Sequence, residues 1–165
     1  MLDNIYDRIL LFIQKMFHSR LIASVSLVQR WNLMSRKMGT AKSLILGIES
    51  SCDDSCAAIV SNQGDVLCSF QLSQEKQNQR NRGIIPSEAA KSHRINIPIV
   101  VKQAMQSVKL DIDAVALTIG PGIAPCLGEG LLFAQQFCID YKKPLVLVNH
   151  MEGHAMAASM QVTCI

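Results

Sequence analysis

The chain has 165 residues and a formal net charge of +3; 49% of its residues are hydrophobic and 18% are charged. This length fits one domain, and this composition excludes an intrinsically disordered chain. Aromatic residues make up only 5%, so the predicted core is aliphatic. No unbroken apolar run exceeds five residues, well short of the roughly 18 that a membrane-spanning helix needs. The sequence therefore predicts a globular chain with no membrane partner.

The positive charge lies in residues 1–43, which hold seven Lys or Arg against two Asp, whereas residues 44–165 carry a net charge of −2. The segment is rich in Arg and Ser, and apolar residues recur at helical spacing between Leu21 and Trp31. This pattern is typical of a mitochondrial transit peptide. Residues 1–43 are predicted to be a transit peptide or a disordered extension, which places the protein in the mitochondrial matrix. The body does not predict a broad phosphate-binding surface, although a local basic patch is compatible with its charge.

None of the six cysteines lies in a C-x-x-C motif, and most lie within apolar runs, where cysteine behaves as a small hydrophobic residue. A matrix location also implies a reducing compartment. The cysteines are therefore predicted to be free thiols.

Three strands are predicted first, over residues 44–48, 56–60 and 66–72, with a hairpin turn at 61–65 where Asn, Gly and Asp cluster. Residues 74–83 are polar and are predicted to form a loop. A helix then begins at Pro86, since proline is favoured in the first turn of a helix. Pro98 predicts a kink or a break into two helices.

The rest of the chain alternates strands and helices. Strands are predicted over residues 114–119 and 145–148, and helices over 127–141 and 149–160. The order β-β-β-α-β-α-β-α predicts an α/β fold with a mixed sheet and helices on its faces. This order resembles the ribonuclease-H-like half of actin-like proteins, which hold a ligand between two such halves.

Two histidines follow the last predicted strand at helical spacing. His150 and His154 are four residues apart, so both rings lie on one face of a helix and can reach one metal ion. Open α/β sheets place ligands at this end of their strands. The alternative is a pair of surface or capping histidines. Glu152 is two residues after the first His, so the motif is not H-E-x-x-H. No third ligand is evident in the sequence, and His93 is predicted to be structural.

Two further polar or glycine-rich turns follow strands. Gly120 and Gly122 lie between a strand and a helix, where backbone N–H groups can approach a phosphate, or where the glycines only allow close packing. Gly128 and Gly130 continue this pattern. Residues 49–54 (ESSCDD) form an acidic turn that either faces a nucleotide–metal unit or caps a hairpin. The catalytic residues stay unknown.

Four blocks of the chain resemble, in order, successive blocks of one family: residues 44–60 (LILGIESSCDDSCAAIV), 83–97 (GIIPSEAAKSHRINI), 113–130 and 144–155 (PLVLVNHMEGHA). The family is that of the tRNA threonylcarbamoyladenosine transferases, earlier described as O-sialoglycoprotein endopeptidase-like. With its basic first segment, the chain resembles the mitochondrial members. The resemblance covers residues 44–160.

The resemblance implies an actin-like fold and transfer of a threonylcarbamoyl group from threonylcarbamoyl-adenylate to adenosine 37 of tRNAs that read ANN codons. It implies that His150 and His154 are two ligands of a divalent metal ion, iron or zinc. The expected partner is tRNA, and a homodimer or a pair with a full-length homologue is left open.

The chain departs from the family pattern in two respects. The family's G-P-G-L-x-x-S-L-x-x-G reads GPGIAPCLGEG here, with Cys126 in place of Ser and the charged Glu129 in place of an apolar residue. The family also continues into a second lobe, whose Asp supplies a third metal ligand. Residues 44–160 are expected to be the N-terminal lobe, followed by a divergent tail at 161–165, and this truncated chain is expected to be inactive alone. The alternatives are a non-catalytic isoform that acts as an interaction module and a fragment of another actin-like ATPase or kinase.

Overall fold

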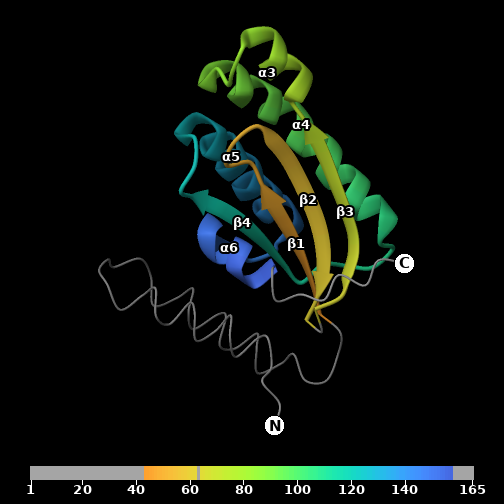
Figure 1. Ribbon diagram of the computed structural model, residues 1–165. Coiled ribbons are helices and arrows are strands. Elements are labelled where there is room, and N and C mark those ends of the chain that lie inside the picture. The colour runs from red at the N-terminus through yellow and green to blue at the C-terminus, as the bar shows by residue number, and fades with distance from the viewer. Residues whose placement is uncertain (1–42, 63, 158–165) are drawn as a thin grey trace.

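The computed structural model describes residues 43–62 and 64–157. A five-stranded mixed sheet with the strand order β3-β2-β1-β4-β5 forms the centre of the fold (Figure 1). Antiparallel pairing joins β1 (Leu44–Glu49), β2 (Asp54–Ser61) and β3 (Val66–Ser73). Parallel pairing joins β1 to β4 (Ala114–Gly120) and β4 to β5 (Leu145–Asn149). The predicted mixed sheet is confirmed.

Four helices surround the sheet within the described residues: α3 (Glu75–Asn81), α4 (Pro86–Ser107), α5 (Ala124–Tyr141) and α6 (His150–Ala157). α4 packs against β2 and β3, and α5 packs against β4, so these two long helices cover one face of the sheet (Figure 1). The core between them and the sheet is aliphatic, as the composition predicts, with Leu46, Ile59, Val100 and Leu117 fully buried.

β1 shows how the sheet separates its two faces. Leu44, Leu46 and Ile48 are buried in the core, while the residues between them are half-buried. Because successive strand side chains point to opposite faces, Glu49 lies on the face away from α4 and α5. The carboxylate at the end of this strand is therefore available to the opposite face.

The predicted hairpin turn between β2 and β3 is confirmed. The backbone N–H of Ser61 donates to the carbonyl of Asp65 at 2.9 Å, and Gly64 adopts a φ of +91° that favours glycine. β2 begins two residues earlier than predicted, at Asp54.

The predicted loop at residues 74–83 is wrong, because α3 lies within it. Polarity suggested a loop, but Gln, Glu, Lys and Arg are all good helix formers. Gln79 donates to the Glu75 carboxylate one turn earlier at 3.0 Å, and Arg82 ends the helix in the left-handed conformation. The observed order of elements therefore has one more helix than the predicted order.

Of the two alternatives predicted at Pro98, a kink or a break, the break is wrong, since α4 runs through Pro98 as one helix. Pro98 is exposed, and so is Arg94, whose carbonyl loses its helical partner because proline has no N–H. α5 begins at Ala124, three residues before the predicted start, because Pro125 belongs to its first turn rather than to the preceding turn.

Several predictions concern residues that the structure does not describe. These are the transit peptide or extension at 1–43, apart from Ser43, the end of the last helix at 158–160 and the tail at 161–165. Cys52, Cys56, Cys68, Cys126 and Cys138 are free thiols, as predicted, and Cys164 lies outside the described residues. Within the described ranges, no helix is long and apolar enough to cross a membrane.

Candidate metal-binding site at the carboxyl edge of the sheet

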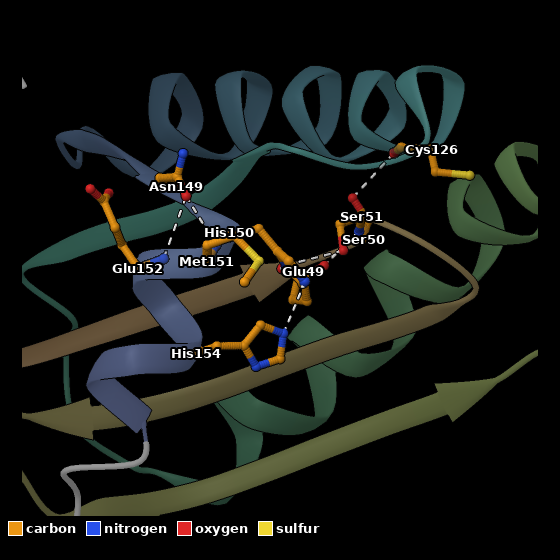
Figure 2. Close-up of polar contacts among 9 residues, drawn as sticks. All are labelled: Glu49, Ser50, Ser51, Cys126, Asn149, His150, Met151, Glu152 and His154. Carbon is orange, nitrogen blue, oxygen red and sulfur yellow. Dashed lines mark hydrogen bonds and ion pairs between the residues drawn. The ribbon is translucent and has the colours of Figure 1, made fainter.

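The carboxyl ends of three parallel strands meet at one edge of the sheet. β1 ends in Glu49, followed by Ser50 and Ser51, β4 ends at Gly120, and β5 leads directly into α6 at His150. Residues more than 70 positions apart are thereby brought together (Figure 2). This edge is where open α/β sheets bind ligands.

The two predicted ligand histidines lie side by side at this edge. The Nε2 atoms of His150 and His154 are 2.9 Å apart, and their rings stand perpendicular with centroids separated by 4.4 Å. The Asn149 side chain accepts the backbone N–H of Met151 at 3.0 Å, which starts α6 at His150. Figure 2 shows both rings on the same side of α6, with the Glu152 side chain pointing away from them. The helix face predicted from the spacing is confirmed.

Glu49 and Ser51 hold the other ring nitrogen of His150. Nδ1 lies 3.3 Å from Glu49 Oε2 and 3.2 Å from Ser51 Oγ. A carboxylate can only accept, so Nδ1 carries the hydrogen and Nε2 keeps its lone pair. A carboxylate that fixes the tautomer of a histidine in this way is a common support for metal ligands.

The environment of Glu49 favours its charged form. Partial burial raises the pKa of this carboxyl, but hydrogen bonds from Ser51, Thr118 and His150 outweigh burial and leave the pKa below its usual value. The Ser51 backbone N–H also donates to Oε1, at 2.5 Å. Glu49 is therefore an ionised acceptor at neutral pH.

The glycine turn after β4 packs directly on the turn after β1. The Ile123 N–H donates to the Ser51 carbonyl at 2.7 Å, and a Cβ on Gly122 would lie 2.6 Å from that same oxygen. Gly120 adopts a φ of +145°, which side chains rarely allow. Close packing thus accounts for Gly122, and a ligand-binding role for Gly120 and Gly122 stays a prediction.

Two glycines further along α5 differ in the space that a Cβ atom would have, namely Gly128 and Gly130. A Cβ on Gly130 would overlap Ser50 Oγ, whose hydroxyl donates to the Cys126 carbonyl at 3.1 Å, whereas a Cβ on Gly128 would meet nothing within 4 Å. Gly130 therefore lets α5 approach β1, and Gly128 has no such role.

The remaining acids of the 49–54 turn are engaged away from the histidine pair. Asp53 accepts from Asn78 at 2.8 Å, and Asp54 accepts from Gln71 at 2.6 Å. No group of three His, Cys, Asp or Glu side chains close enough to hold a metal occurs among residues 43–62 and 64–157. The described part of the site thus offers two converging imidazoles and an orienting carboxylate.

His93 occupies a different environment at the same edge. It is fully buried, its Nε2 donates to the Cys52 carbonyl at 3.0 Å, and its Nδ1 lies 2.7 Å from Ser55 Oγ. Both ring nitrogens are engaged by the protein, which agrees with the structural role predicted for it.

Sequence reasoning missed Ser51 and Thr118 as partners of Glu49. Their positions were the available signal: Ser51 follows strand β1, and Thr118 is the polar residue of the apolar strand β4. The structure also explains the unexpected charge of Glu129, because Arg94 donates to both of its carboxylate oxygens, at 3.0 and 2.6 Å. These hydrogen bonds from Arg94 hold the pKa of Glu129 below its usual value.

The strand order β3-β2-β1-β4-β5, with β2 antiparallel to its two neighbours, is that of a ribonuclease-H-like lobe of the actin-like class, as the sequence predicts. A solved structure described as an uncharacterized protein with similarity to peptidase YEAZ from Pseudomonas aeruginosa superposes with a TM-score of 0.54. It is 17% identical, and the match covers 73% of this chain and 49% of that chain. At this identity the likeness concerns the fold alone.

The sequence comparisons identify the family. The family model of tRNA N6-adenosine threonylcarbamoyltransferase (TsaD) matches residues 65–164. The chain is 40% identical over 132 residues to the mitochondrial tRNA N6-adenosine threonylcarbamoyltransferase of Rattus norvegicus, covering 78% of this chain and 32% of the relative. It is 42% identical over 120 residues to the Clostridium novyi enzyme, covering 71% and 35%. The chain belongs to the tRNA N6-adenosine threonylcarbamoyltransferase family and spans about a third of the length of these relatives.

Proposed function

We propose that this chain supplies the N-terminal, histidine-bearing lobe of a mitochondrial threonylcarbamoyltransferase. The reaction transfers a threonylcarbamoyl group from threonylcarbamoyl-adenylate to adenosine 37 of ANN-decoding tRNAs. The family match supports the reaction, and the mitochondrial names of relatives in rat and human support the compartment. The single structural observation that carries the proposal is the His150–His154 pair, oriented by Glu49 at the ligand-binding edge.

The donor set fits a divalent metal ion such as zinc or iron. His150 and His154 would bind the metal through Nε2, the atoms that already converge in the structure. The bound metal would act as a Lewis acid toward a carbonyl or phosphoryl oxygen of the acyl-adenylate. Glu49 keeps the His150 ring in the required tautomer, and Ser51 steadies the same nitrogen. We include in the proposal a transit segment at 1–43 and a nucleotide-facing role for Gly120 and Gly122.

The test is a chimera in which residues 44–157 replace the corresponding lobe of the full-length rat relative. We expect the chimera to form threonylcarbamoyladenosine in an unmodified ANN-decoding tRNA transcript, measured by mass spectrometry of the digested RNA. His150→Ala should reduce product at least 100-fold and abolish tight metal binding. Lys109→Ala, which alters an exposed residue far from the site, is the matched control and should leave both unchanged.

The outcomes test the proposed function and the predicted inactivity of the chain alone separately. A folded chimera that makes no product, or one whose product survives His150→Ala, would contradict the proposed function. The unaltered 165-residue chain is expected to make no product alone, since the described site offers only two metal ligands. Product from that chain alone would overturn the predicted inactivity and leave the proposed function intact.

A further inference from the structure

α3 and its C-cap residue carry three exposed cations. Lys76, Arg80 and Arg82 are all exposed and form no ion pair within the part of the chain that the structure describes. We name these three residues the α3 basic surface. Glu75 is the only acid on the helix, and its carboxylate accepts from Gln79. The surface therefore keeps an excess of positive charge on a body whose net charge is −2.

α3 is fixed to its surroundings by three side-chain hydrogen bonds. Asn78 donates to Asp53 at 2.8 Å, which joins the helix to the turn that follows Glu49 and Ser51. The Ser92 hydroxyl donates to Gln77 at 3.1 Å, and the buried Gln74 donates to the Ala89 carbonyl at 3.2 Å, which join it to α4. The cations thus project from a helix that is tied to the site rather than from a free loop.

The topology places α3 at the same edge as the histidine pair. β3 is antiparallel to β2, and β2 is antiparallel to β1, so β3 ends at the edge where β1, β4 and β5 end. α3 follows β3 directly and lies beyond the ends of β1 and β3 (Figure 1). Two strand spacings, roughly 10 Å, separate β3 from β1. A polyanion that reaches the site can therefore span the distance to α3.

We propose that the α3 basic surface binds the phosphate backbone of the RNA substrate beside the reacting nucleotide. The inference rests on the proposed function, which makes RNA the substrate of this edge. An extended polyanion matches unpaired cations that are held at a fixed place, because each neutralised phosphate releases condensed counterions. Phosphate contacts of this kind orient the RNA and carry no sequence information.

The test measures binding of the full chain to an unmodified ANN-decoding tRNA transcript by fluorescence anisotropy between 50 and 200 mM KCl. The variant Lys76→Gln/Arg80→Gln/Arg82→Gln removes the charges and keeps good helix formers. If each cation contacts one phosphate, the slope of log K against log salt falls by about 2, and the affinity at 0.1 M salt falls about 100-fold.

The matched control is Lys102→Gln/Lys109→Gln/Lys142→Gln. These three lysines are also exposed, but they lie near the opposite edge, where β4 and β5 begin. Lys142 adopts a φ of +54°, close to the +55° of Arg82, so both sets contain one left-handed residue. The control should keep wild-type affinity within about twofold and the wild-type salt slope.

The results distinguish the two proposals. Binding by the wild type and the α3 variant with the same slope would overturn the role of α3 and leave the proposed function standing. A wild type that does not bind the transcript would overturn the role of α3, and the chimera assay decides the proposed function separately. Because Arg80 lies in the last turn of α3, the double variant Lys76→Gln/Arg82→Gln is measured as well, with circular dichroism as the check of folding. A folded double variant should show about two thirds of the slope reduction of the triple variant, and an unchanged slope would contradict the proposal.

Discussion

His93 and the His150–His154 pair lie at the same edge of the sheet in opposite environments. His93 is fully buried, and Ser55 and the Cys52 carbonyl engage both of its ring nitrogens. The His150 side chain is 25% exposed, and only its Nδ1 contacts a carboxylate. Its Nε2 faces a second imidazole rather than a protein acceptor.

The two environments differ in whether a ring nitrogen keeps a lone pair that a ligand can use. A buried histidine with two protein partners stabilises the turn above it and has no lone pair for a ligand. A half-exposed histidine oriented by a carboxylate contributes less to the fold and keeps a lone pair directed at the site. His93 and the His150–His154 pair share their residue type and their edge of the sheet. Burial and hydrogen-bond partners therefore decide which histidine is structural and which keeps a nitrogen available to a ligand.

The largest expected effect comes from the buried histidine, His93. His93→Ala should lower the free energy of unfolding by about 2–4 kcal/mol, because it leaves a cavity and removes the partner of the buried Ser55 hydroxyl and of the Cys52 carbonyl. Urea unfolding with an unchanged m value measures this loss. The matched variant His154→Ala removes an exposed ring and should cost less than about 0.5 kcal/mol. Similar losses for the two variants would show that the contrast between the regions is false.

Glu49→Gln is expected to act on the His150–His154 pair. It keeps the shape of the side chain but removes the charge that holds the His150 tautomer, so zinc affinity should fall about 10- to 100-fold. Competition with a chromogenic chelator measures the affinity, and Glu129→Gln, a charge loss on α5 where the carboxylate pairs with Arg94 of α4, is the control. Unchanged zinc affinity in Glu49→Gln would mean that the carboxylate does not support the ligand.

The same variant gives a pH test. The pKa of Glu49 is lower in the folded protein than its usual value of 4.5, so its contribution to stability is present above pH 4.5. That contribution is lost as the pH falls through the folded pKa, since the unfolded chain binds the proton more readily. The stability difference between wild type and Glu49→Gln should therefore shrink on acidification below pH 4.5. A difference that grows there would reverse the sign of the inferred shift.

The smallest expected effect separates two glycines of α5. Gly128→Ala should raise the free energy of unfolding by about 0.5–1 kcal/mol, because the added methyl group meets no atom and alanine favours the helix. Gly130→Ala should instead destabilise by about 1–3 kcal/mol, because its methyl group would overlap the Ser50 side chain. Thermal unfolding of both variants tests this, and a destabilising Gly128→Ala would place an unrecognised contact at that position.

Much of the fold could be predicted from local pattern. Apolar strands, the turn at residues 61–65 and the start of α4 at Pro86 depend on neighbouring residues, and all three are confirmed. The errors occurred where a residue type is compatible with more than one local structure. Polar helix formers at 75–81 suggested a loop, and Pro98 suggested a break, although a proline on the exposed side of a helix is tolerated.

The site was predictable only in part. The spacing of His150 and His154 determined by itself that both rings share a helix face, because four residues make slightly more than one turn. The sequence also determined the family, since the motif blocks occur in order along the chain. Only the tertiary structure decided which groups support those rings, because Glu49 and Ser51 reach His150 across about 100 residues through the pairing of β1, β4 and β5. Strand pairing and burial also made His93 structural and tied α3 to the site, since both depend on contacts between residues distant in the sequence.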